Sequence, residues 1–178
     1  NGNGIVVYLD QSKFSGFYKD GRREGKGSII SNEIKFDVNF KDDNFNGSGI
    51  LIQGGNTFKN HYINGLRDGL SHHQYSDTSV FSGNYQNNKK NGEGVYNYPD
   101  GSEFKGNYQN GKRNGLGNYF FSDGIQYSGY FLDNLPHGEG RLQFNNNIIY
   151  EGNFLNGVKH GKGEFTFQNN KKFEGNFK

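Results

Sequence analysis

Aromatic and polar residues alternate along the chain in short, recurring stretches. Residues 104–108 have the sequence Phe-Lys-Gly-Asn-Tyr, with rings at the first and last positions and a glycine midway between them. Because successive side chains of a strand point to opposite faces, this pattern predicts a strand with one aromatic face and one polar face. Residues 115–121 predict a return strand that places Gly117 and Tyr119 on one face. The 3.6-residue periodicity of an amphipathic helix is absent.

Turn residues separate these predicted strands. Residues 110–114, Asn-Gly-Lys-Arg-Asn, begin with the Asn-Gly pair that favours a tight hairpin turn, and we expect all five to form the turn segment. Residues 122–124, Ser-Asp-Gly, predict a second turn into the next strand. The unit is therefore a β-hairpin.

The hairpin pattern repeats with a period of 22 or 23 residues. Eight copies hold two aromatic residues four positions apart, and most copies carry a glycine between them. Such a period predicts an array of stacked units. We expect one array over residues 1–178, with about seven full units and a cut within a unit at both ends. The second glycine of a Gly-x-Gly pair marks each return strand, with a serine at one position: Gly4, Gly27, Gly49, Ser71, Gly94, Gly117, Gly140 and Gly163.

Composition agrees with a thin, ring-rich fold. Hydrophobic residues make up only 30% of the chain, yet aromatics reach 16% and there are 29 glycines. Rings can cover bare glycine backbone on the same face of a sheet, which replaces a thick aliphatic core. The net charge of +2 with interspersed signs argues against nucleic-acid binding, which usually needs a basic stripe. Without cysteine, disulfides and thiolate metal sites are excluded.

The unit resembles the MORN (membrane occupation and recognition nexus) repeat. Residues 150–163, Tyr-Glu-Gly-Asn-Phe-Leu-Asn-Gly-Val-Lys-His-Gly-Lys-Gly, follow the family pattern closely, with Phe154 where the family usually has Trp. The resemblance implies an all-β, elongated, twisted, single-layer antiparallel solenoid of consecutive hairpins with an aromatic-lined groove. It also implies a non-enzymatic scaffold in the cytoplasm, associated with the cytoskeleton or a cilium, as in radial spoke head components.

Departures from the pattern cluster between residues 36 and 75. Val38, Asn60 and Ser71 replace strand glycines, Asp43 replaces a turn glycine, and His73 occupies an apolar or aromatic position. One interpretation is drift in a tolerant array. The other is a change of curvature or a local partner site.

No residues form a convincing catalytic, cofactor or metal site. The segment from Gly106 to Arg113 matches most of a phosphate-binding loop, but Arg113 lacks the hydroxyl for magnesium and no helix is predicted to follow. The recurring glutamates fall on the predicted polar face. We interpret the histidines as turn and groove residues, so no metal, no cofactor and no enzymatic activity are expected: His61, His72, His73, His137 and His160.

The aromatic face is the candidate functional surface. A single sheet layer leaves part of that face open or covered by a partner. We expect Tyr96, Tyr98, Tyr119 and Tyr127 to be the most exposed of its rings, and return-strand rings to be less buried than Phe104 or Tyr108. The candidate groove comprises Tyr85, Tyr96, Tyr98, Phe104, Tyr108, Tyr119, Phe121, Tyr127 and Phe131.

Three functional hypotheses follow. The first is a scaffold whose groove holds a helical or extended peptide of a cytoskeletal or ciliary protein. The second is a phosphoinositide or membrane-associating module of a larger protein, acting through lysine-rich turns. The third is a homodimerising rod, because exposed sheet edges invite pairing. The turn cations of the second hypothesis are Lys89, Lys90, Lys112, Arg113, Lys171 and Lys172.

Overall fold

The fold consists of β-strands and the turns between them. A computed structural model describes residues 1–178, with seventeen strands and no helix, so the predicted all-β class is confirmed. The chain divides into two compact units, residues 1–89 and 90–178, and each is described by itself. With no helix present, no helical segment has the length and apolarity that crossing a membrane requires.

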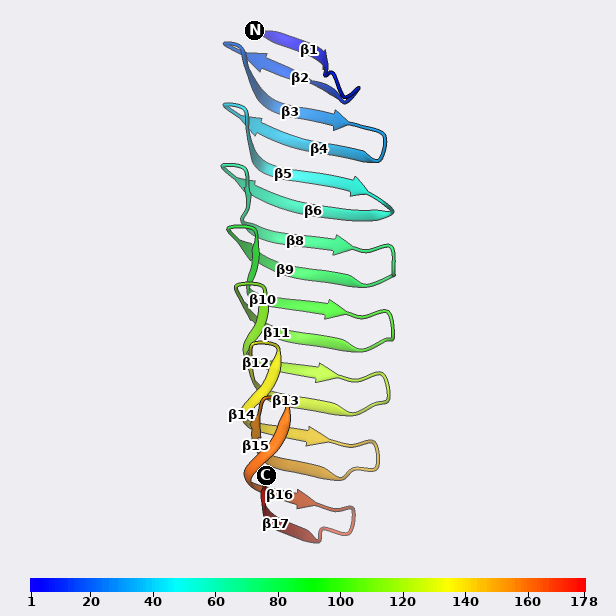
Figure 1. The fold of residues 1–178 in the computed structure, drawn as a ribbon, viewed down its shortest axis with the longest axis vertical. Coiled ribbons are helices and arrows are strands. Elements are labelled where there is room, and N and C mark those ends of the chain that lie inside the picture. Colours follow the sequence, from blue (N-terminus) through cyan, green and yellow to red (C-terminus); the bar gives the residue numbers. More distant parts are fainter. The chain divides into compact units, whose positions relative to one another are not determined.

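Unit 1 is a single antiparallel layer of consecutive hairpins (Figure 1). Each strand pairs with the next along the chain, except that the short β7 pairs only with β6 and β6 also pairs with β8. Its strands are β1 (Gly2–Val7), β2 (Lys13–Lys19), β3 (Arg22–Ile30), β4 (Ile34–Lys41), β5 (Asn44–Gln53), β6 (Asn56–Ile63), β7 (Leu66–Arg67), β8 (Gly69–Gln74) and β9 (Val80–Gln86).

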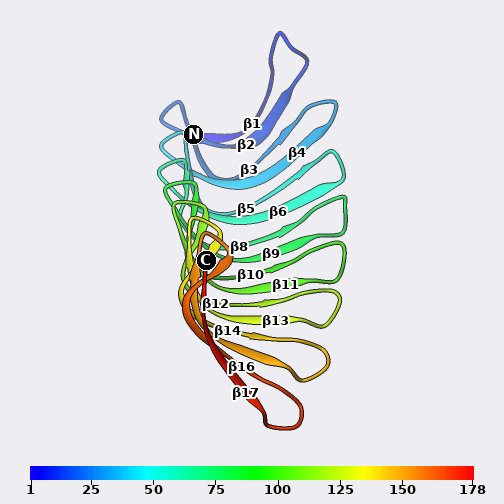
Figure 2. The same ribbon diagram turned by 60° about the horizontal axis from the view of Figure 1, so that its bottom comes forward.

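Unit 2 has the same construction and greater regularity. Each of its strands pairs antiparallel with its sequence neighbour. Within both units the hairpins are curved instead of flat (Figure 2). The strands of unit 2 are β10 (Lys89–Asn97), β11 (Glu103–Gln109), β12 (Lys112–Phe120), β13 (Gln126–Leu132), β14 (Leu135–Gln143), β15 (Ile149–Leu155), β16 (Val158–Thr166) and β17 (Lys172–Phe177). The single-layer hairpin fold is thus confirmed for each unit, while one continuous array over 1–178 stays a prediction.

The tight turns are shorter than the sequence suggested. Only Asn110 and Gly111 form the turn between β11 and β12, with φ angles of 52° and 88°. Two successive positive φ angles define the type I′ turn, whose twist matches that of the flanking strands. The predicted five-residue turn over 110–114 is therefore wrong, because residues 112–114 already lie in β12.

Most of the opposite ends of the hairpins carry five-residue loops with a shared geometry, whereas the loops of residues 31–33 and 54–55 are shorter. In the loop of residues 98–102, the amide of Tyr98 donates to the carbonyl of Ser102 at 2.9 Å, and Asp100 Oδ1 accepts from the amide and hydroxyl of Ser102 at 2.9 and 2.6 Å. The same Asp–Ser pairing closes the loops at Ser12 and Ser79. The predicted turn over 122–124 lies within such a loop.

The two glycines of each Gly-x-Gly pair have different roles, as Gly115 and Gly117 show. The pairing between β11 and β12 shifts register after Gly106, and Gly115 has a φ of 98° on the longer side of this bulge. Gly117 is extended, but a Cβ there would lie 2.6 Å from Cε2 of Phe104. The first glycine permits the bend, and the second leaves room for the ring.

Candidate partner-binding surface

The first ring of each regular unit forms the core. In unit 2, Phe104 is fully buried, and its ring covers both Gly106 and the paired Gly117. It packs edge-to-face against Tyr108 and Phe131, with ring centroids 5.4 and 5.1 Å apart. The next two hairpin repeats of unit 2 show the same packing around Tyr127 and Tyr150. The predicted cover of glycine by aromatic rings therefore accounts for the core.

Several candidate groove residues belong to this core. Tyr85, Phe104, Tyr108 and Phe131 are all buried. The expected exposure of Tyr127 is wrong, because only 2% of it is accessible. Its hydroxyl donates to the carbonyl of Tyr130 at 3.0 Å, and burial raises its pKa to about 12. A local backbone acceptor thus lets a tyrosine replace the phenylalanine of other units.

The remaining candidates form an open, stacked row. Tyr96 and Tyr98 lie 4.5 Å apart between ring centroids, Tyr98 and Tyr119 5.7 Å, and Tyr119 and Phe121 4.5 Å, all with tilted planes. The three tyrosines are partly exposed and Phe121 is 43% exposed. The prediction that return-strand rings are less buried than Phe104 and Tyr108 is therefore confirmed.

The row has further members that the sequence prediction missed. Phe165 stacks with Phe144 and with Phe167 at centroid distances of 6.4 and 6.2 Å. Phe144 and Phe167 follow Phe121 at intervals of one period, so the repeat could have indicated them. We call these residues of unit 2 the ring row: Tyr96, Tyr98, Tyr119, Phe121, Phe144, Phe165 and Phe167.

Positively charged side chains lie over the rings at intervals of one and two periods. The guanidinium carbon of Arg113 is 5.3 Å from the ring centroid of Tyr119 and 5.4 Å from that of Phe104. Lys90 Nζ is 4.6 Å from the centroid of Tyr96, and burial lowers its pKa to about 8. Lys159 Nζ lies 5.5 Å from Phe144 and 5.6 Å from Phe165. These distances fit cation–π contacts. We call Lys90, Arg113 and Lys159 the cation row.

A family comparison matches this repeated construction. The MORN repeat profile matches residues 14–32, 81–103, 104–126, 127–148 and 150–172, which together exceed half of the chain. The chain belongs to the MORN repeat family. No curated protein sequence matches it.

Solved structures with a similar fold are only distantly related in sequence. The G-box domain of the microcephaly protein CPAP aligns with 12% identity and a TM-score of 0.51, over 99% of this chain and 100% of that one. The SAS-4 (dCPAP) TCP domain of Drosophila melanogaster, solved with a proline-rich motif of Ana2, aligns with 11% identity and a TM-score of 0.47, over 98% and 90%. The TCP10 domain of Danio rerio CPAP, solved with a STIL peptide, gives 11% and 0.49, over 98% and 83%. Such identities show the fold alone.

The irregular MORN hairpins of unit 1 contain a buried polar cluster. His73 is 1% exposed, and its Nε2 lies 2.7 Å from Oδ1 of Asn60. The Tyr85 hydroxyl lies 3.4 Å from Nδ1 of the same imidazole. Asn60 and Ser71 occupy the positions that Gly106 and Gly117 have in a regular repeat. Phe58 packs edge-to-face on His73 with a centroid distance of 5.0 Å. These departures therefore replace glycine–ring packing with a polar core.

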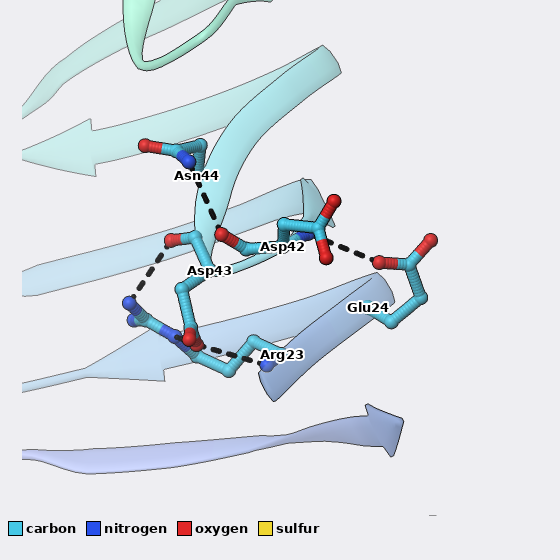
Figure 3. Close-up of polar contacts among 5 residues, drawn as sticks. All are labelled: Arg23, Glu24, Asp42, Asp43 and Asn44. Atoms are coloured by element: carbon cyan, nitrogen blue, oxygen red, sulfur yellow. Dashed lines mark hydrogen bonds and ion pairs between the residues drawn. The ribbon is translucent and has the colours of Figure 1, made fainter. Parts of the chain in front are cut away.

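In every second MORN repeat, an Asx residue of the tight turn contacts an arginine of the preceding repeat, as Asp43 and Arg23 show (Figure 3). Asp43 Oδ1 accepts from the amide and Nε of Arg23 at 2.9 and 3.0 Å, and Arg23 also donates to the carbonyl of Asp43 at 3.0 Å. Asn88 receives the same three contacts from Arg67. Asp43, which replaces a turn glycine, thus has a structural role. This contact was not predicted, although glycine and Asx alternate in the sequence at the second turn position: Gly21, Asp43, Gly65, Asn88, Gly111, Asn134 and Gly157.

Two further histidines, His61 and His72, make local contacts within the MORN scaffold. His61 Nδ1 lies 2.9 Å from the carbonyl of Asp68, and His72 Nδ1 lies 2.7 Å from the hydroxyl of Ser82. His, Asp and Glu side chains nowhere gather in groups of three or more that could hold a metal ion. An open hollow of about 540 Å³ on the polar face of unit 1 lies around Ser28, Asp37 and Ser48.

Proposed function

We propose that this MORN chain is a non-enzymatic scaffold that binds a peptide segment of a partner protein along the ring row of unit 2. The segment is helical or extended, and the setting we propose is a cytoskeletal assembly in the cytoplasm. The observation that carries this proposal is the open stack of Tyr96, Tyr98, Tyr119 and Phe121 on a one-layer sheet. No second layer of the unit covers these rings.

Physical properties of the row support peptide binding. Stacked neighbours limit the motion of each ring, so little side-chain entropy is lost when a partner binds. Tyrosine offers a large apolar surface and a hydroxyl, the combination that is enriched at binding hot spots. The equivalent return-strand positions of unit 1 hold fewer rings, with Ile29, Leu51 and His73 at the position of Tyr96. The binding surface that we propose is therefore confined to unit 2.

The lipid alternative has weaker support from the same residues. Lys112 forms an ion pair with Asp133 at 3.2 Å, and Lys172 pairs with Glu164 at 2.7 Å. Lys90 and Arg113 lie over rings and are half-buried. The predicted turn cations thus do not form one free basic patch for anionic headgroups. The homodimer alternative rests only on exposed sheet edges, and an enzymatic role has no constellation of residues to support it.

The test is peptide selection followed by calorimetry. Random 16-residue peptides displayed on phage are selected on the full chain, and the strongest binder is synthesised. Tyr98→Ala and Phe121→Ala should each weaken its binding by about 2 kcal/mol or more, roughly 30-fold, the scale of hot-spot residues. Circular dichroism verifies that each variant is folded.

The matched control is Glu93→Lys, on the polar face of β10. It should change binding little apart from a salt-dependent contribution. Folded ring variants that bind as tightly as the unmodified chain, together with loss of binding in Glu93→Lys, would place the site on the polar face. Strong binding to phosphoinositide vesicles in the absence of any ring-dependent peptide would favour the membrane alternative.

A further inference from the structure

We propose that the partner segment is acidic as well as apolar, with carboxylates that contact the cation row while its apolar side chains contact the ring row. This inference rests on the proposed function and specifies the chemistry of the partner.

Arg113 provides the first evidence. Its guanidinium carbon lies within 5.6 Å of three ring centroids, those of Phe104, Tyr119 and Phe131. The side chain is half-buried, and none of the ion pairs in the structure includes it. Its amide donates to Asn134, but that bond leaves the guanidinium N–H groups uninvolved. A fixed, partly desolvated cation thus lies next to a ring-row tyrosine.

Lys159 occupies the equivalent place two periods later. Its ammonium lies over Phe144, Tyr150 and Phe165 at 5.5, 5.3 and 5.6 Å, and Phe144 and Phe165 belong to the ring row. No ion pair of the structure includes Lys159 either. Lys90, one period before Arg113, lies over the ring-row residue Tyr96 in the same manner. The two rows therefore accompany each other through unit 2.

No ion pair joins a carboxylate of unit 2 to Arg113 or Lys159. Asp100 and Asp123 bind their own loops through Ser102 and Ile125. Acidic residues on the strands and turns pair with other bases: Asp133 with Lys112, Glu151 with Arg141 and Glu164 with Lys172. Rings lie beneath the charged groups of Arg113 and Lys159, and no ion pair includes either residue, so a partner supplies the complementary charge.

A carboxylate is the group that this arrangement favours. Hydrogen bonds between ionised partners are shorter and stronger than neutral ones, and partial desolvation strengthens them further. Holding the cations on rings also reduces the entropy lost when a carboxylate binds. A basic segment would bring like charges together beside the rings, which is unfavourable.

The experiment uses the selected 16-residue peptides and the full chain. Asp and Glu should outnumber Lys and Arg in the enriched sequences, alongside aromatic or aliphatic residues. Replacing the acidic residues of the strongest binder by Asn or Gln should weaken binding by about tenfold or more, as expected for hydrogen bonds to charged groups. Arg113→Gln and Lys159→Gln should each weaken binding of the acidic peptide similarly. Lys105→Gln, on the polar face of β11, is the matched control and should leave binding unchanged.

The variants and peptides also form a double-mutant cycle. Arg113→Gln should weaken binding of the acidic peptide much more than binding of its neutral counterpart, because only the acidic peptide has carboxylates that can pair with Arg113. Equal losses for both peptides would show that Arg113 acts through ring packing, and would overturn the inference. Enriched peptides that need Tyr98 and Phe121 but are neutral or basic would also overturn it, while the proposed function would stand. Peptides whose binding ignores the rings would reject both.

Discussion

Gly117 and Phe104 should be energetically coupled, because the ring lies where a Cβ of residue 117 would be. A Cβ at Gly117 would lie 2.6 and 2.8 Å from two ring carbons of Phe104, well inside the roughly 3.5–4.0 Å that carbon atoms prefer. The ring is fully buried and cannot move away easily. Gly117→Ala should therefore destabilise the protein by about 1–3 kcal/mol, the usual cost of overpacking.

The cost should largely disappear when the ring is absent. Phe104→Val is expected to cost about 2–4 kcal/mol by itself, because it leaves a cavity over the glycines. In that background, the nearest remaining atom to a Cβ at Gly117 is the carbonyl oxygen of Lys105 at 3.4 Å. Adding Ala should then cost close to nothing, since alanine suits a strand better than glycine by about 0.5–1 kcal/mol.

The assay is urea denaturation of the unmodified chain, both single variants and the double variant, with unfolding monitored by circular dichroism. A coupling energy of about 2 kcal/mol is expected. The control is Leu116→Ala, whose exposed side chain lies on the opposite face, and it should add to Phe104→Val without coupling. Additivity of Gly117→Ala and Phe104→Val within about 0.5 kcal/mol would refute the packing of ring on glycine.

Three other predictions concern alkaline pH, backbone strain and modularity. Because burial raises the pKa of Tyr127 to about 12, its contribution to stability is complete below pH 10 and is lost between about pH 10 and 12. In denaturant titrations, the Tyr127→Phe variant should lose less stability over that interval than the unmodified chain. Equal losses would contradict this prediction. Thr78 has a φ of 74°, which is costly for a β-branched residue, so Thr78→Gly should raise the unfolding free energy by about 1 kcal/mol, and destabilisation in urea titrations would argue against strain there. Deleting residues 95–117, one period, should leave a cooperative thermal transition by circular dichroism, whereas deleting 95–106 should abolish it by putting strands out of phase, and similar melts would reject this register argument.

The hairpins were predictable because the periodicity of two and the Asn-Gly turns are local signals. Phe104 and Tyr108 lie on the buried face and Lys105 on the exposed one, as the alternation indicated. The length of the turn was not predictable by the same reasoning. The bulge at Gly115 inserts extra residues into β12, so that polar residues 112–114 resemble a long turn although they are extended.

The site was predicted only in part, because the exposure of a ring depends on hydrogen bonds and packing that the residue pattern does not show. Tyr127 was expected to be open since tyrosine is amphipathic, but the carbonyl of Tyr130 satisfies its hydroxyl inside the core. The period alone would have placed Tyr127 with Phe104 among the buried rings. The contact of Arg23 with Asp43 spans 20 residues and depends on turn geometry, which single-unit patterns do not reveal.

The most direct test of the central claim is fluorine NMR of the chain labelled with 3-fluorotyrosine, titrated with the strongest selected peptide. Resonances are assigned by single Tyr→Phe substitutions. Binding along the ring row should shift the resonances of Tyr96, Tyr98 and Tyr119. The resonance of the buried Tyr127 should stay nearly unchanged. Tyr130 is 40% exposed but lies on the opposite face of β13, so its resonance should also stay nearly unchanged. A titration that shifts Tyr130 and leaves the three ring-row tyrosines unmoved would contradict the account.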